Sequence, residues 1–319
     1  MLRAYLATDK DLVTLPEGAD LARASWIDLF APTPQDVASL AALGVDVPTL
    51  ADMEEIEISN RLYLQGDLAY MTCVIPGQNA EGQVESLPVS FILGPQRLVT
   101  VRHHEPRPFV TFPGRAAQSS CGATTPERIY VGLLEEIVGR MADLLEGAGR
   151  ELDRTSAQVL SNGEELPDSS IRGALVTVGR SAEQVSRVRL CLMTLERMLV
   201  FHIPTIEKRT EASKLKPTIA AIQLDIHALQ VHSDFLDARI NLAVDATMGM
   251  INLRQNTTVK ILSVVAALFL PPTLIASMYG MNFHIMPELD WRWGYPLALG
   301  AMVASSVATF VILRWKKWL

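Results

Sequence analysis

The sequence predicts an α+β cytoplasmic domain, a long helical stalk and two transmembrane helices at the carboxyl end. Three observations carry this prediction. Short strand-like and helix-like segments alternate near the amino terminus, apolar residues recur at helical spacing from Pro217 onward, and two long apolar runs follow. In order, we expect an α/β domain (1–125), a helical part (126–216), a stalk helix (217–258), a first span (259–279), a periplasmic loop (280–294), a second span (295–313) and a basic tail (314–319).

Charge is distributed unevenly along the 319 residues. From Arg254 to the end there are six basic and two acidic residues, a net +4, which leaves 22 basic and 33 acidic residues before it, a net −11. Nucleic acid binds to clustered Lys and Arg through its phosphates. An acidic body therefore predicts cations, and not nucleic acid, as partners. The three cysteines, Cys73, Cys121 and Cys191, are far apart and form no CxxC pair, which favours free thiols in a reducing compartment.

No signal-peptide pattern opens the chain, so we expect the amino-terminal body to stay in the cytoplasm. The sequence also lacks the GxSxG, HExxH, Walker and GxGxxG motifs. We therefore predict neither an enzyme nor an organic cofactor.

Local signals place the elements of the amino-terminal body. Residues 24–29 are predicted as a strand, and a helix follows with Thr33 as its N-cap, Pro34 in its first turn and Gly44 past its end. Two hairpins are predicted at 61–75 and 87–103, turning at Gly66-Asp67 and Gly94-Pro95 respectively. Helical spacing then covers 129–160 and 181–201, with a break at 161–170.

Two polar clusters lie in this body. The stretch 51–59, "ADMEEIEIS", carries Asp52, Glu54, Glu55 and Glu57, which suit either a hard cation held by carboxylates or a solvated acidic face. The stretch 102–108, "RHHEPRP", is a weak metal candidate, because adjacent histidines on a strand point to opposite faces.

The stalk helix carries a seam at alternating spacings of three and four, typical of a heptad pattern. Its members are Ile219, Ile222, Ile226, Leu229, Ser233, Leu236, Ile240, Ala243, Thr247 and Met250. Pro217 suits the first turn of this helix. The seam fits an ordinary long helix of a bundle and a stalk beside a pore equally well.

The two apolar runs predict membrane spans. Lys260 is the only charge in the first, the second has none, and four of the five tryptophans (Trp291, Trp293, Trp315 and Trp318) bracket the second as interfacial anchors do. Basic residues before the first span and after the second place both termini inside. Two helices cannot enclose a water-filled path, so conduction requires an oligomer.

The first span has unusual content for a simple anchor. Pro271 and Pro272 remove backbone donors and are expected to kink the helix or weaken its hydrogen bonding. Ser263, Thr273 and Ser277, with Asn256 at the entrance, form a sparse polar track. Each hydroxyl alone is expected to bond back to its own helix.

Several motifs now carry a resemblance to a known family. They are "YGMN" (279–282), "MPELDWRWGYP" (286–296), "FLPPTLIASMYG" (269–280), the ending "KKWL", and, in the body, "WIDL" (26–29), "EEIEIS" (54–59) and "RLCLM" (189–193). On these the chain resembles the CorA magnesium/cobalt transporter family, in the branch typified by enterobacterial CorA. The Gly-Met-Asn triplet with the MPEL loop is the most specific of these signals.

The resemblance implies a funnel-shaped homopentamer in the inner (plasma) membrane. Stalk helices would run into the first spans, second spans would form an outer ring against lipid, and the seam from Ile219 would face the pore axis or its neighbours. Asn282, with Gly280 and Met281 shaping its turn, matches the outer selectivity filter. Asn256 matches the lower asparagine ring, Leu262 and Leu270 match hydrophobic constrictions, and Thr273 is a polar step between them.

The resemblance also implies the ion and its control. Mg²⁺ would enter down the membrane potential, worth about 4.6 kcal/mol per divalent ion at 100 mV, and Co²⁺ and Ni²⁺ would follow the same path. Glu288 and Asp290 would concentrate cations at the mouth. In the family, cytoplasmic Mg²⁺ that binds between the soluble domains of neighbouring subunits controls the gate. Asp52 and Asp245 match family acids, but Ala221 stands where an acid is expected, with Asp225 as a substitute one turn on.

Two alternatives stay open. One is a ZntB-like, proton-coupled Zn²⁺ transporter, against which Gly-Met-Asn and MPEL count. The other is a membrane-anchored cation sensor that does not conduct, against which the polar track and the twin prolines count. His284, beside the mouth, fits an exposed bystander better than a pH sensor.

Overall fold

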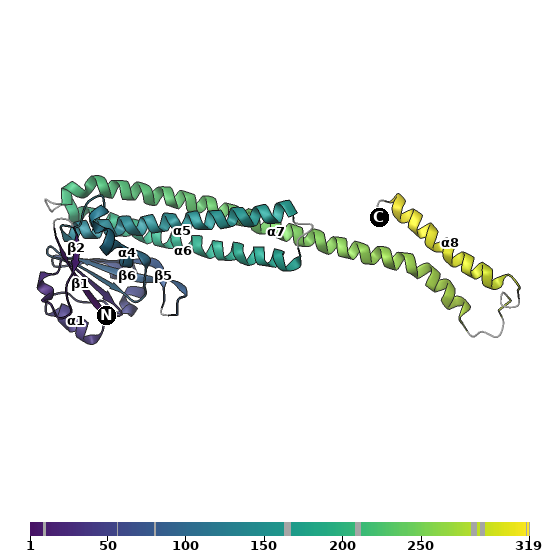
Figure 1. The fold of residues 1–319 in the computed structure, drawn as a ribbon, viewed down its shortest axis with the longest axis horizontal. Coiled ribbons are helices and arrows are strands. Elements are labelled where there is room, and N and C mark those ends of the chain that lie inside the picture. Colours follow the sequence, from purple (N-terminus) through teal and green to yellow (C-terminus); the bar gives the residue numbers. More distant parts are fainter. Residues whose placement is uncertain are drawn as a thin grey trace. The chain divides into compact units, whose positions relative to one another are not determined.

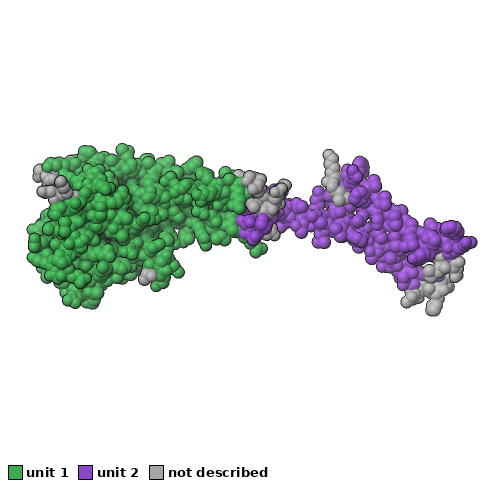
Figure 2. Space-filling view, viewed as in Figure 1, with its two compact units in different colours: residues 1–158, 172–244 green, residues 159–171, 245–319 purple. Residues whose placement is uncertain are grey.

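The computed structural model describes residues 1–8, 11–55, 57–79, 81–162, 167–207, 212–281, 286–287, 291–316 and 318. The chain divides into two compact units. Unit 1 holds residues 1–158 and 172–244, and unit 2 holds residues 159–171 and 245–319 (Figure 2).

Unit 1 contains a seven-stranded mixed sheet of order β2-β1-β3-β7-β6-β5-β4 (Figure 1). Its strands are β1 (Leu2–Ala7), β2 (Leu12–Thr14), β3 (Trp26–Phe30), β4 (Leu62–Gln65), β5 (Leu68–Gln78), β6 (Val84–Leu93) and β7 (Leu98–Arg102). Among the strands that the structure describes, β3 and β7 pair in parallel and the other pairs are antiparallel. Both predicted hairpins are confirmed, one turning at Gly66, whose φ of +59° suits glycine, and the other at Gly94.

Short helices and turns fill the connections of the sheet. They are η1 (Leu21–Arg23), α1 (Pro34–Ala41), α2 (Leu50–Glu54), α3 (Ile58–Arg61), α4 (Arg107–Arg115) and η2 (Ala116–Gln118). The predicted Thr33 cap of α1 is confirmed as a capping box with Asp36. Helix α4 was not predicted.

The sheet separates two cores because alternate residues of each strand face opposite sides. Ile27 and Leu29 pack with Leu40 of α1 and Met53 of α2 on one side. Trp26 lies in the core of the other side, which includes residues of α4 and the long helices α5 (Pro126–Asn162), α6 (Asp168–Glu207) and α7 (Lys216–Tyr279). A short η3 turn (Ala212–Leu215) precedes α7.

The stalk seam is covered by its own chain. Ile219, Ile222, Ile226, Leu236, Ile240 and Ala243 belong to the same buried cluster as residues of α5 and α6. The expectation that this seam faces a pore axis or neighbouring copies is therefore wrong. The other interpretation, a helix in a bundle, is confirmed for this face, since α5, α6 and α7 run alongside one another in unit 1 (Figure 1).

A buried ion pair crosses the parallel part of the sheet. The guanidinium of Arg102 donates to both carboxylate oxygens of Asp28, at 2.9 Å for Nη2, and both side chains are 1% exposed. Thr100 donates to the same carboxylate at 2.8 Å and accepts from the Trp26 indole at 3.0 Å. Arg102 also donates to the carbonyl of His104. The network thus satisfies the charge it buries.

The two histidines of the "RHHEPRP" stretch do not form a metal pair. His104 is fully buried and its Nε2 lies 2.7 Å from the carbonyl oxygen of Ile75, whereas His103 is partly buried. Burial lowers the pKa of His104, so its neutral ring donates this hydrogen bond. The ring lies close to the end of β5, where a Cβ on Gly77 would lie 2.5 Å from it, so glycine suits this position.

In unit 2, the carboxyl part of α7 and helix α8 (Gly294–Trp315) match the two predicted spans. Their most apolar stretches are 0% and 6% buried in the chain, so they do not form a core within it. Helix α7 continues through Pro271 and Pro272. Neither proline has an N–H, so the carbonyls of Ala267 and Leu268 lack their usual helical donors.

Removing one partner of the buried ion pair is expected to be costly. Asp28→Ala leaves the Arg102 charge buried without compensation, and the free energy of unfolding should fall by about 3–5 kcal/mol. Urea denaturation of the detergent-solubilised protein, followed by circular dichroism, measures this loss. Arg115→Ala is the control, because the pair Arg115–Glu136 is largely exposed on the Arg side and should contribute less than about 1 kcal/mol. Equal losses in the two variants would contradict a special role for the buried pair.

Candidate functional site

A second seam, which we name the exposed seam, runs along α7 two residues out of step with the buried one. It also alternates spacings of three and four, and all of its members are exposed. They are Leu224, Ala228, Val231, Phe235, Ala238, Leu242, Asp245, Gly249, Asn252, Asn256, Val259, Ser263, Ala266, Leu270, Thr273, Ser277 and Gly280. At 3.6 residues per turn an offset of two is about 200°, so the seams lie on opposite faces of the helix.

Five of the site residues that were predicted individually from the sequence lie together on the exposed seam. Asp245, Asn256, Leu270, Thr273 and Gly280 are all members. Leu262 is not, but it is adjacent to the member Ser263 and is 69% exposed. The sequence contains the same alternating spacing of three and four at these positions. The spacing could therefore have predicted this second seam as well as the first.

Other predicted residues cannot be placed. Asn282, His284, Glu288 and Asp290 lie outside the described residues. Their predicted roles at the filter and mouth therefore stay predictions.

Two hydroxyls on the exposed seam, those of Ser263 and Thr273, bond back to their own helix as expected. Ser263 donates to the carbonyl of Val259 at 2.8 Å, and Thr273 donates to that of Phe269 at 2.7 Å. Each oxygen keeps acceptor lone pairs, so it can still accept a hydrogen bond from a water that approaches the seam. The seam is thus mildly polar within the span without carrying charge.

The end of α7 is closed by a turn at Gly280. Its N–H donates to the carbonyl of Ala276 at 2.9 Å, and the N–H of Met281 lies 3.4 Å from the carbonyl of Met278. A Cβ on Gly280 would lie 3.2 Å from the Ala276 oxygen, which is tighter than usual. Glycine therefore suits a turn that ends the helix just before Asn282.

Asp52 has a structural role that the cation interpretation missed. Its carboxylate accepts from the Thr49 backbone N–H at 2.9 Å and from the Thr49 hydroxyl at 2.6 Å, completing a capping box at the start of α2. These bonds lower its pKa, so it is ionised at neutral pH. It also borders a pocket of about 250 Å³ with Asp46, Tyr63 and Tyr70.

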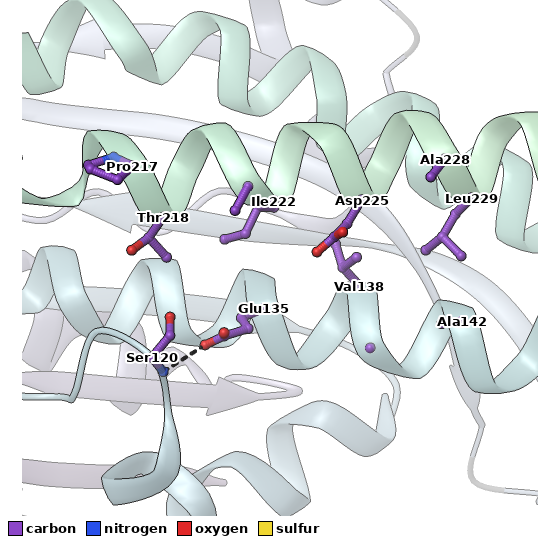
Figure 3. Close-up of a pocket in the computed structure, with 12 residues that line it drawn as sticks. Ser120, Glu135, Val138, Ala142, Pro217, Thr218, Ile222, Asp225, Ala228 and Leu229 are labelled. Carbon is purple, nitrogen blue, oxygen red and sulfur yellow. Dashed lines mark hydrogen bonds between the residues drawn. The ribbon is translucent and has the colours of Figure 1, made fainter.

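Asp225 lies in a different place. It lines a largely apolar groove of about 600 Å³ between α5 and the start of α7, together with Ala221 and Ile222 (Figure 3). Glu135 faces the groove from α5, but its carboxylate already accepts from Ser119 and from the Ser120 N–H. The groove is therefore not a preformed carboxylate cage.

One chain does not bring the predicted regulatory acids together. Asp52 and Asp225 line separate pockets of unit 1. Over the described residues, no group of three or more His, Cys, Asp or Glu is placed to hold a metal ion, which includes the described part of the 51–59 cluster. Within those residues that cluster fits the solvated-face interpretation.

Comparison with known proteins shows a relationship over the full chain. The family model described as CorA-like Mg²⁺ transporter protein matches residues 22–316. The chain is 32% identical over 321 residues to "Magnesium transport protein CorA" of Haemophilus influenzae and 32% identical over 324 residues to that of Escherichia coli (strain K12), covering all of both relatives. The solved CorA magnesium transporter of Methanocaldococcus jannaschii shares the fold, with a TM-score of 0.73 at 17% identity over 100% of this chain and 99% of that one.

The mixed sheet, the long α7, the two candidate spans and these matches agree with one another. The chain belongs to the family of CorA-like Mg²⁺ transporter proteins.

Proposed function

We propose that the chain forms a homopentameric magnesium channel in the inner membrane, with both termini in the cytoplasm. The exposed seam of α7 would line a water-filled pore, and the membrane potential would drive Mg²⁺ inward. Co²⁺ and Ni²⁺ would follow the same path. The observation that carries the proposal is the continuity of the exposed seam from Leu224 to Gly280 through five predicted site residues.

The two seams give α7 separate tasks. The buried seam holds α7 against α5 and α6, and the opposite face keeps large apolar side chains in water, with Leu224 71%, Phe235 56% and Leu242 70% exposed. Heptad-spaced apolar residues on a helix that already has intrachain partners favour packing against further copies of the same helix. The channel then acquires the helices that two spans alone cannot supply.

The chemistry of the seam fits a hydrated divalent cation. Mg²⁺ gives up its water reluctantly, so a pore that must pass it quickly does best to bind the hydrated ion. Neutral amides, at Asn256 and at Asn282 past the helix end, accept hydrogen bonds from ion-bound water without holding the charge too tightly for release. Gly280 and Met281 would present Asn282, while Glu288 and Asp290 raise the local cation concentration outside.

Regulation would act between copies. Asp52 is ionised and exposed on one face of unit 1, and Asp225 borders the apolar groove on another. Because one chain keeps them in separate pockets, a cytoplasmic Mg²⁺ held by both would have to bridge neighbouring copies. Asp245, on the exposed seam, would add a cation site near the cytoplasmic end of the pore.

The alternatives have less support. A ZntB-like Zn²⁺ transporter shares the family fold, but the relatives at 32% identity over their whole length are named magnesium transport proteins. A sensor that does not conduct needs no polar positions on the exposed seam within the span, yet Ser263, Thr273 and Ser277 occupy three of them.

Growth rescue tests the transport proposal. Expression of the wild type should restore growth of a magnesium-transport-deficient bacterium in low Mg²⁺, because uptake through the pore replaces the missing route. Asn282→Ala should fail to rescue, since it removes the filter amides. If the wild type does not restore growth, the transport proposal is refuted. If the Asn282→Ala variant restores growth as well as the wild type, Asn282 is not part of the filter.

Assembly through the exposed seam can be tested separately. Leu242→Glu places a charge in the proposed contact between helices, so the detergent-solubilised protein should lose its oligomeric mass in light scattering. Asn241→Glu adds the same charge at the neighbouring exposed position off the seam and should keep that mass. Identical masses for the two variants would rule out the seam as the contact.

The role of Asp52 in gating requires a variant that spares the cap. Asp52→Asn keeps an oxygen for the Thr49 hydrogen bonds but removes the charge, and should weaken inhibition of uptake by internal Mg²⁺ in proteoliposomes. Thr49→Ala removes the cap hydroxyl and keeps the charge, so its inhibition should stay close to wild type. If only Thr49→Ala changed the inhibition, Asp52 would act through α2 stability and not as a ligand.

A further inference from the structure

We infer that Asn252 forms a second ring of amides in the pore, one helical turn to the cytoplasmic side of Asn256, and that the two rings together bind a hydrated divalent cation. The inference rests on the proposed pore. Asn252 and Asn256 are both members of the exposed seam, both belong to unit 2, and both are exposed. Four residues of α-helix rise about 6 Å, so the rings would be stacked along the same face.

The residues around Asn252 leave this face open and uncharged. Gly249, the preceding seam member, has no side chain, and a Cβ there would meet no atom within 4 Å. Arg254 lies between the two asparagines in sequence, and two residues correspond to about 200° of helix. Its positive charge is therefore directed away from the seam on which the amides lie.

Other polar side chains of this turn are already engaged. Thr257 donates to the carbonyl of Leu253 at 3.0 Å, and Thr258 donates to that of Arg254 at 3.1 Å. These threonines do not belong to the seam, and Thr258 lies about 200° from Asn256. The asparagines are the amide-bearing members of the seam within 245–280.

Two neutral rings at this separation suit the ligand that the pore would carry. A divalent cation that keeps its waters presents hydrogen-bond donors in every direction, and Asn side-chain oxygens accept them. Water on one side of the ion could bind the Asn256 ring while water on the other side binds the Asn252 ring. Because neither ring is charged, the ion is held in its hydrated form and released onward to Asp245 and the cytoplasm.

Charge placed at Asn252 should change conduction in a way that charge elsewhere on the turn does not. In proteoliposomes loaded with a fluorescent Mg²⁺ indicator, Asn252→Asp should lower the half-saturating Mg²⁺ concentration and the maximal influx by about tenfold each, because five carboxylates hold the ion more tightly. Thr258→Asp adds the same charge off the seam, about 120° round the helix from Asn252, and should leave both close to wild type. Asn252→Ala should reduce influx at subsaturating Mg²⁺ by about fivefold, the loss expected for one net hydrogen bond.

The outcomes separate this inference from the pore proposal. If wild type carries no Mg²⁺ flux, the pore fails and the Asn252 ring fails with it. If Asn256→Ala impairs flux but Asn252→Asp behaves like Thr258→Asp, the pore stands and the second ring is refuted. Size-exclusion chromatography confirms that each variant keeps the wild-type assembly, which is expected because the altered side chains are exposed in the chain.

Discussion

Helix α7 must satisfy two different environments on opposite faces, and the rest of the structure follows from that constraint. One face carries the buried seam, which completes the core formed by α5, α6 and the sheet. The opposite face remains exposed over the whole length of the helix. Because both seams repeat at the same spacing of about 3.5 residues, they stay about 200° apart wherever both are present.

The two seams end differently, and the difference explains how a single helix can pass from body to membrane. The buried seam stops near Met250, beyond which the helix no longer needs the cover of its own bundle. The exposed seam continues, and its composition changes at Asp245 from apolar residues to Gly249, Asn252 and Asn256. Apolar members favour dry packing between helices, whereas small and amide-bearing members leave room for water. The change falls just before the apolar run that begins at 259.

Local signals in the sequence were sufficient for most elements of the fold but not for their partners. The Thr33 cap, the Gly66 turn and the two apolar runs predicted features that the structure contains, because each depends on a few neighbouring residues. Periodicity identified the residues of the buried seam but not what covers them, since α5 and α6 are distant in sequence. The pair Asp28–Arg102 spans 74 residues and had no local signal. Asp52 was different: the Thr49-to-Asp52 spacing is a local capping-box pattern, but it lies inside an acidic cluster that also fits a cation site.

The distribution of charge along the chain is consistent with a pore that passes a divalent cation. The body before Arg254 carries a net −11, yet the exposed seam of α7 has a single carboxylate, at Asp245, and none through the span. A divalent ion bound by several carboxylates inside a low-dielectric span would be held too strongly to leave, because opposite charges attract far more strongly there than in water. Acidic groups placed in the body attract cations without lying in their path. In the proposed pore, neutral amides and hydroxyls along the seam interact with the ion's water and not with the ion itself. The acidic side chains that attract the ion are thus largely separate from the neutral side chains along which it moves.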